Sequence, residues 1–133
     1  MMRKFKKPDY EATLQERIRI KDVVGSNHLA RFVVDVISEL NLSKIYAGYA
    51  DVGGAPIAPE ILLGLLFYGY ATGVFSSRKI EKATYERMPF RYIAGGLHPD
   101  HSTIAEFRKT FIGELQNLFV QTLLLAQVAE IFQ

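Results

Sequence analysis

An uninterrupted apolar run in the middle of the chain limits the available folds more than any other feature. The run covers residues 61–71, with Pro59 shortly before it and Gly73 shortly after it. Proline suits the first turn of a helix, where its missing N–H costs no hydrogen bond, and the glycine marks a break. A helix that is apolar on nearly every face has to be covered on nearly every face. We therefore expect a helix from residue 59 to about residue 72 at the centre of the fold.

A membrane-spanning segment is the alternative to a buried core helix. The 11 residues of the run are roughly half of the ~20 that cross a bilayer, which favours the core helix. The basic N-terminus is followed by Pro8, Asp9 and Glu11 instead of an apolar stretch, so we recognise no secretory signal. We expect a protein of the cytoplasm that makes no contact with membranes.

The segment before the run also follows helical periodicity. Apolar residues recur every three or four positions in a helix that Ser26 or Asn27 can cap and that ends near Asn41. Residues 42–49 fit a further short turn of helix, and the glycines and prolines after them indicate a loop. The first 25 residues are polar and weakly periodic. We therefore expect a basic, partly ordered arm at residues 1–25 and a helical domain at residues 26–133.

The longest periodic segment lies in the C-terminal part of the chain. After a loop at residues 95–100, Ser102 or Thr103 can cap a helix, and Thr103 and Glu106 have the spacing of a capping box. Apolar residues then recur at steps of three or four as far as residue 132, which indicates one long helix. No segment shows the alternation that indicates a strand. The predicted fold is therefore all-α, a compact multi-helix domain.

The composition excludes several kinds of function. The chain has 133 residues, a formal net charge of +2 and no cysteine. Disulfides, thiolate zinc sites and cysteine nucleophiles are therefore excluded. The size suits one domain, and a hydrophobic content of 49% argues against disorder. A charge this small does not by itself identify a nucleic-acid-binding protein, so the distribution of the basic residues has to decide.

A helix, a short break and a second helix follow one another in the middle of the chain. The break begins at Gly73, where a glycine relieves strain in a tight turn. The second helix ends near Met88, before a single turn at residues 89–92. A helix-turn-helix has this layout, and its second helix enters the major groove of DNA. Two serines at the start of the second helix can cap it and leave N–H groups that meet a phosphate.

Basic residues gather on one side of this second helix. At 100° per residue, Arg78, Lys79 and Lys82 fall within about a third of the circumference. Glu86 joins them, while Ile80 and its apolar neighbours occupy much of the opposite side. A solvated helix face is the alternative to a DNA-contacting surface, because charged faces are common. The candidate DNA-contacting residues are Ser76, Ser77, Arg78, Lys79 and Lys82, together with Arg108 and Lys109 on the last helix.

Residues 98–101 raise the question of a metal site or a catalytic centre. His98, Asp100 and His101 stand close together, but they lie in a loop, and Pro99 restricts the approach of the ligands. We expect Asp100 and His101 to shape the turn and to help cap the last helix. The acidic residues are dispersed, and no serine has an evident histidine partner. We therefore recognise no catalytic set, and we expect no metal and no cofactor in this chain.

The last helix changes character along its length. Up to about Gly113 it is two-sided, whereas from Leu118 onward apolar residues occupy further faces. A helix that is apolar almost all round is buried on more than one side. Three interpretations stay open for this surface: burial within the domain, a homodimer contact, or a junction with a further domain.

Three ordered motifs resemble a known family. They are HLARFV at residues 28–33, the central segment at residues 58–83, and the pair FRYIAGG and PDHSTIAEFR at residues 90–96 and 99–108. They resemble the N-terminal helical domain of DDE-class bacterial insertion-sequence transposases, the InsH-like group. The resemblance runs from about residue 20 to the C-terminus. It implies a module that recognises double-stranded DNA at transposon ends, with oligomerisation or domain docking as the alternative.

The resemblance also implies where the chemistry of the family lies. An RNase H-like catalytic domain follows this region in the family, and three carboxylates there hold two divalent metal ions. None of these carboxylates maps onto Asp35, Asp51 or Asp100, so we expect the catalytic domain to be absent here and the chain not to be an enzyme.

One departure from the family pattern affects the expected DNA contacts. Relatives often have an aromatic and basic residues near the start of the central helix, at positions that correspond here to Ile57, Glu60 and Gly64. None of these three side chains is a cation that would bind phosphate. The departure therefore shifts the expected phosphate contacts to Arg78 and its neighbours on the following helix.

Overall fold

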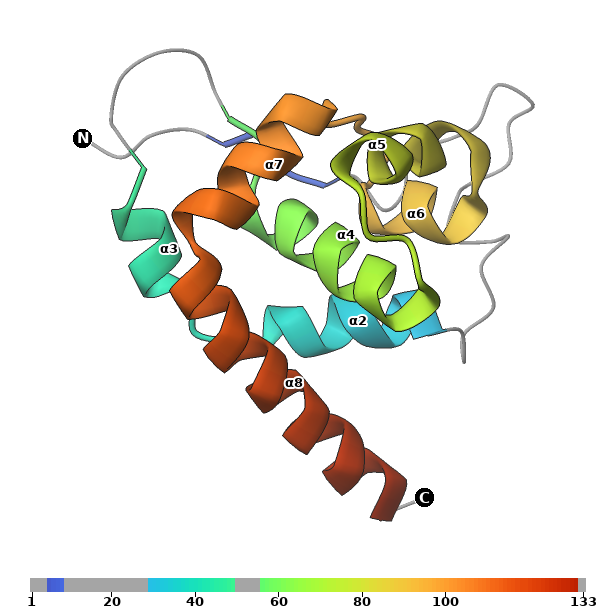
Figure 1. The fold of residues 1–133 in the computed structure, drawn as a ribbon. Coiled ribbons are helices and arrows are strands. Elements are labelled where there is room, and N and C mark those ends of the chain that lie inside the picture. The colour runs from blue at the N-terminus through green and yellow to red at the C-terminus, as the bar shows by residue number, and fades with distance from the viewer. Residues whose placement is uncertain (1–4, 9–28, 50–55, 132–133) are drawn as a thin grey trace.

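The computed structural model describes residues 5–8, 29–49 and 56–131 (Figure 1). Within these residues it contains helices and an isolated bridge but no strand, which confirms the all-α prediction. Ser26 and Asn27, as well as most of the predicted arm, lie outside the described residues. In chain order the described helices are α2 (Leu29–Ser38), α3 (Ser43–Ala47), α4 (Pro59–Thr72), α5 (Ser77–Glu86), α6 (Met88–Ile93), α7 (His101–Thr110) and α8 (Ile112–Ile131).

Helix α4 lies at the centre of the fold, as the apolar run predicts. It begins at Pro59, and all of residues 61–69 are buried. In Figure 1, α2, α5, α6 and α7 surround it. Gly64 allows one close contact, because a Cβ there would lie 2.8 Å from Cγ2 of Ile93 on α6. No single helix in the described part of the chain is long and apolar enough to cross a membrane; α4 and α5 meet that criterion only as a pair, bent by 97° at their break.

Helices α2 and α6 cover one side of α4 and complete the core there. The rings of Tyr68 on α4 and Phe90 on α6 meet edge to face, with centroids 5.0 Å apart. Fully burying an apolar side chain of this kind contributes about 1.5–3 kcal/mol, so the contact surface of three helices stabilises the fold strongly. The buried residues of α2 and α6 are Ala30, Val33, Val36, Ile37, Phe90, Tyr92 and Ile93.

Two helices end a few residues before their predicted ends. After Ser38 the backbone hydrogen bonds tighten to the i→i−3 pattern, which closes α2. Helix α5 ends at Glu86, because Pro89 has no N–H with which to continue the helix. Helix α6 starts at Met88 immediately afterwards, and the predicted single turn at residues 89–92 lies within it.

The prediction of one long C-terminal helix capped by Ser102 or Thr103 is wrong in two respects. Asp100 is the N-cap, which confirms the expectation that it helps to cap this helix: its Oδ1 accepts a hydrogen bond from the Thr103 N–H at 2.8 Å, so Ser102 and Thr103 lie inside the first turn. The helix then breaks at Phe111, whose φ and ψ are −113° and 22°, and α8 starts at the next residue. The Phe111 ring is buried, and Gly113, a poor helix former, follows closely.

A short N-terminal segment contacts the loop before α4 and the C-terminal part of α3. Lys6 forms an isolated parallel bridge with Ile57. Phe5 packs its ring edge-on against Tyr46 and Tyr49, with centroid distances of 4.9 and 5.3 Å. This part of the predicted arm is therefore extended and packed against the helical domain.

Candidate nucleic-acid interface

The turn between α4 and α5 is compact and folds back on α4. Gly73 ends α4 with a φ of 83°, in the left-handed region that favours glycine. The N–H of Val74 donates to the carbonyl oxygen of Gly69 at 2.8 Å. A Cβ at Gly69 would lie only 2.5 Å from the carbonyl oxygen of Val74, so the turn approaches α4 as closely as a glycine permits. The angle of 97° between the helices is within the ~90–120° of helix-turn-helix pairs.

Ser76 is the N-cap of α5, which decides between the two serines that the sequence offers. Its Oγ accepts a hydrogen bond from the Lys79 N–H at 3.0 Å. Ser77 is the first residue of the helix and is half-buried. The cap satisfies one of the four N–H groups that a helix start leaves without a partner. The start of α5 is therefore well defined.

The two sides of α5 differ as the sequence predicts. Ile80, Ala83 and Thr84 are buried. The opposite side is exposed to solvent and carries Arg78, Lys79, Lys82 and Glu86. Nζ of Lys82 lies 4.0 Å from Oε1 of Glu86, and an exposed pair of this kind contributes little and leaves the lysine available.

Two of these cations stand where a helix least favours them. Arg78 and Lys79 lie in the first turn of α5. This turn, residues 77–80, contains no acidic residue. The helix dipole places partial positive charge at this end, and a charge there changes stability by typically ~0.3–1 kcal/mol. Cations in the first turn are thus unfavourable for the isolated helix. The same arrangement attracts an approaching anion.

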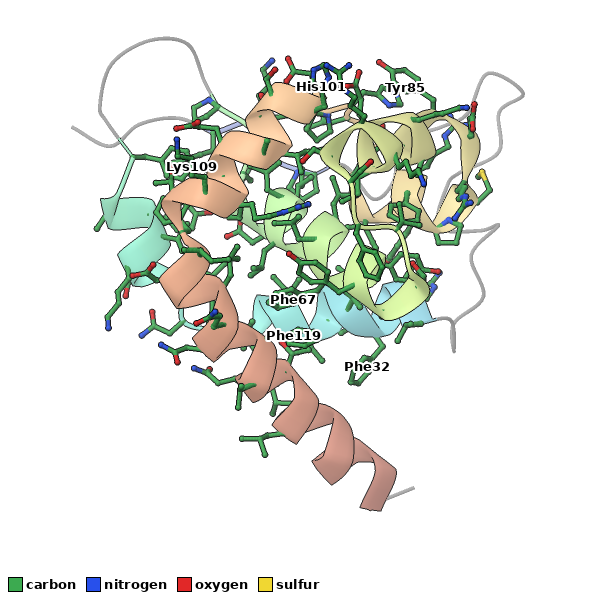
Figure 2. All side chains as sticks on the ribbon, in the orientation of Figure 1. Phe32, Phe67, Tyr85, His101, Lys109 and Phe119 are labelled. Carbon is green, nitrogen blue, oxygen red and sulfur yellow. The ribbon has the colours of Figure 1, made fainter. Side chains whose placement is uncertain are left out.

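Helix α5 is fastened to the start of α7 through Glu81. Oε1 of Glu81 accepts hydrogen bonds from both the backbone N–H and the Nδ1–H of His101, each at 2.8 Å. The side-chain bond and then the backbone bond from His101 lower the pKa of Glu81. Figure 2 shows His101 at the start of α7, beside α5. Glu81 is therefore occupied within the fold and does not neutralise the exposed cations.

His98 fastens the same helix to the loop before α7. Its ring stacks on Tyr85 with a centroid distance of 3.9 Å and an angle of 4°. The Thr84 hydroxyl donates to the Glu81 carbonyl and lies 3.1 Å from Nδ1 of His98, so Nδ1–H donates to the hydroxyl oxygen. Burial and the neighbouring charge of Arg91 lower the pKa of His98. In the described ranges, no three His, Asp or Glu side chains are grouped as a metal site would require.

The structure places the two candidate residues of α7 differently. Nη2 of Arg108 donates to the carbonyl oxygen of Phe75 at 2.9 Å, and its guanidinium lies 5.9 Å from the ring centre of Tyr70. Arg108 therefore supports the turn from within the fold. Lys109 is exposed, and in Figure 2 it lies on the other side of α7 from α5. The shared surface consists of Ser76, Ser77, Arg78, Lys79 and Lys82.

Comparison with protein families gives one match. The profile of a family described as "Transposase domain (DUF772)" matches residues 18–110. The chain belongs to this transposase-domain family. The match extends from before α2 to the last residue of α7 and so includes the whole α4–α5 arrangement. No curated protein and no solved structure matches the chain.

Three residues of the transposase domain contribute to this surface but could not be identified from the sequence. Glu81 and His98 hold α5 through partners that come from other elements. Phe75 lies in the turn and is 58% exposed, the largest exposed fraction among the large hydrophobic side chains of the described residues. A large apolar residue directly before a serine cap was the one available signal for Phe75, whereas the contacts of Glu81 and His98 depend on tertiary packing.

Proposed function

We propose that this transposase domain binds double-stranded DNA through the exposed face of α5, and that its targets are the terminal repeats of an insertion sequence. One observation carries the proposal: α5 packs its apolar side at 97° to α4 and presents Arg78, Lys79 and Lys82 outward from its first six residues. In helix-turn-helix proteins, residues in the N-terminal part of the second helix contact base edges. Membership of the transposase-domain family supports DNA as the ligand.

The local charge of α5 supports this assignment better than the net charge of +2 does. Three cations share the exposed face with one carboxylate, Glu86, because Glu81 is bound to His101. In the described residues, the only ion pair of Glu86 is the exposed one with Lys82. Such a face offers contacts to phosphates, and each contact releases counterions from the DNA. The proposal assigns binding and no strand cleavage to this chain. Nicking of a supercoiled plasmid by the chain with Mg²⁺ would overturn that part.

Fluorescence anisotropy with a mixed-sequence duplex of about 30 base pairs, titrated between about 50 and 200 mM salt, tests the binding surface. Replacing Arg78, Lys79 and Lys82 together by alanine should weaken binding and reduce the salt slope by about 0.9 for each lost phosphate contact. A matched pair of single variants locates the effect. Lys79→Ala should weaken binding, whereas Lys44→Ala, which removes an exposed lysine from distant α3, should not. Equal losses from both would contradict an interface on α5.

Selection from a random duplex library tests sequence recognition separately. If the domain recognises terminal repeats, the selected duplexes should share a short common sequence, and that sequence should occur at the ends of the parent insertion element. Lys82→Ala should relax the selected sequence at one or two positions, because a lost base contact changes discrimination by about 1–3 kcal/mol. A library that yields no common sequence would leave only non-specific binding.

A second candidate function, assembly of transposase copies, rests on α8. This helix extends beyond the other helices in Figure 1, and residues 115–129 contain no charged side chain. Val120 and Leu124, one helical turn apart, are 55% and 56% exposed. Sedimentation should detect a dimer that Val120→Lys with Leu124→Lys dissociates and that the control Ala105→Lys, at an exposed position of α7, leaves intact. A monomer at all concentrations would contradict assembly through α8.

A further inference from the structure

The exposed ring of Phe75 is held in place and does not belong to a loose loop. The residue before it, Val74, is buried and bonded to Gly69, and the residue after it caps α5. Arg108 donates to the carbonyl oxygen of Phe75 at 2.9 Å across 33 positions of the chain. The backbone is therefore fixed on both sides of a phenyl ring that stays 58% exposed.

Phe75 is the outer end of a row of aromatic rings that leads into the core. Its ring lies 6.2 Å from that of Tyr70, with an angle of 34° between the planes. Tyr70 in turn lies 6.2 Å from Phe119, and Phe119 lies 5.3 Å from the buried Phe67. Figure 2 shows Phe67 and Phe119 facing each other between α4 and α8. The row supports the Phe75 ring from the protein side and leaves another flat ring room on the solvent side.

The charges beside this ring indicate the ligand. Ser76 follows Phe75 directly. Arg78 and Lys79 lie three and four positions after Phe75. A ligand that fits both features has a flat, weakly polar ring attached to negative charges. A nucleotide within a DNA strand has this chemistry: its base can stack on an aromatic ring while its phosphates meet cations and helix N–H groups.

We propose that Phe75 stacks on an unstacked nucleobase of DNA while Arg78 and Lys79 hold the adjoining phosphates. A base inside an intact duplex is covered on both faces, so the contact requires a flipped, mismatched or unpaired base. The domain should therefore prefer a duplex that contains one unpaired base over the same duplex fully paired. This inference rests on the proposed DNA-binding function and adds to it the class of DNA site that the turn recognises.

The test compares two duplexes of about 30 base pairs that differ only by one unpaired 2-aminopurine, a fluorescent base whose emission falls when it stacks. The wild-type domain should quench this base and bind the unpaired duplex roughly 10-fold more tightly, within the range of measured base–aromatic stacking. Phe75→Ala should abolish both effects, Phe75→Tyr should retain them, and Phe75→Leu should lose the quenching. Ile112→Ala, at an apolar side chain on α8 that is 50% exposed, is the matched control and should retain the quenching.

The other outcomes separate this inference from the function on which it rests. Normal, salt-dependent binding to paired duplex with no quenching and no preference would overturn the stacking role and leave DNA binding through α5 intact. No binding to either duplex would overturn both. A dimer that Phe75→Ala dissociates in sedimentation would assign the exposed ring to a second copy of the chain instead of to DNA.

Discussion

Gly69→Ala places one methyl group where the α4–α5 turn comes closest to α4. The new Cβ would lie 2.5 Å from the carbonyl oxygen of Val74 and 3.4 Å from Cδ1 of Ile80. The oxygen belongs to the backbone, so no side-chain rotation removes the clash. The turn has to move outward by roughly 1 Å, in a region packed as densely as an organic crystal. The hydrogen bond from Val74 N–H to the Gly69 carbonyl oxygen is strained by the same movement.

The change in the free energy of unfolding caused by Gly69→Ala is the sum of two opposing contributions. Overpacking typically costs about 1–3 kcal/mol, and a clash with a backbone atom belongs to the upper part of that range, about 2–3 kcal/mol. Replacing glycine by alanine inside a helix returns about 1 kcal/mol. We expect a net destabilisation of about 1–2 kcal/mol. With an unfolding entropy of about 2.1 cal/mol/K for each of the 133 residues, this lowers Tm by about 4–7 °C. Thermal unfolding followed by circular dichroism measures the change.

Gly113→Ala is the matched control, because it adds the same methyl group in open space. Among the described residues, no heavy atom lies within 4 Å of a Cβ at Gly113, near the start of α8. Helix propensity alone should therefore raise stability by about 0.5–1 kcal/mol. Gly69→Ala with a Tm at or above that of the wild-type domain would refute the close approach of the turn. Gly69→Ala should also bind duplex DNA more weakly at a temperature where it is folded, because α5 moves with the turn.

The remaining predictions concern the cap and the titratable contacts of α5. Ser76→Ala should destabilise the domain by about 1 kcal/mol, because it removes the N-cap, whereas Ser77→Ala should change little; urea unfolding separates the two. The hydrogen bonds from His101 lower the pKa of Glu81, so their stabilisation is present above the ordinary carboxyl pKa of 4.5 and is lost as the pH falls through the lower folded value. Unfolding measured against pH should show this loss in the wild-type domain but not in Glu81→Gln. Burial lowers the pKa of His98 from 6.5, so the stability of the domain should also fall as the pH drops below 6.5. His98→Phe should remove this pH dependence while it keeps a ring that can stack on Tyr85.

The central helix and the turn after it could be predicted because their signals are local. Pro59 and Gly73 bracket the apolar run, and the structure begins and ends α4 next to them. The sidedness of α5 follows from 100° per residue, so the buried Ile80 and the exposed Arg78 were both expected. Local backbone preferences and burial act in the same direction in this part of the chain.

The C-terminal helices show where local signals fail. The sequence offered both Asp100 and the capping-box pair Thr103 and Glu106 at this helix start, and local signals did not decide that Asp100 takes the Thr103 N–H. The break at Phe111 accompanies burial of its ring, 5.2 Å from that of Phe107. Periodicity runs straight through this break, because residues on both sides of it face the core.

The charged face of α5 could be predicted from the sequence, but the side-chain contacts that hold α5 and its turn in place could not. Arg108 has the sequence appearance of another exposed cation, yet it bonds to Phe75, which lies 33 positions away. Glu81 likewise has its partner, His101, 20 positions further along the chain. Contacts across such separations arise from tertiary packing, and one sequence contains no periodic signal for them.

Amide chemical-shift mapping tests the central claim most directly. The domain, with a mass of 15.0 kDa, is titrated with duplex DNA while its ¹H–¹⁵N spectrum is recorded. We expect the largest shifts at Ser76–Glu86, with smaller shifts in α4 and none in α3. Shifts that leave α5 unchanged and gather on another surface, such as α8, would contradict the account.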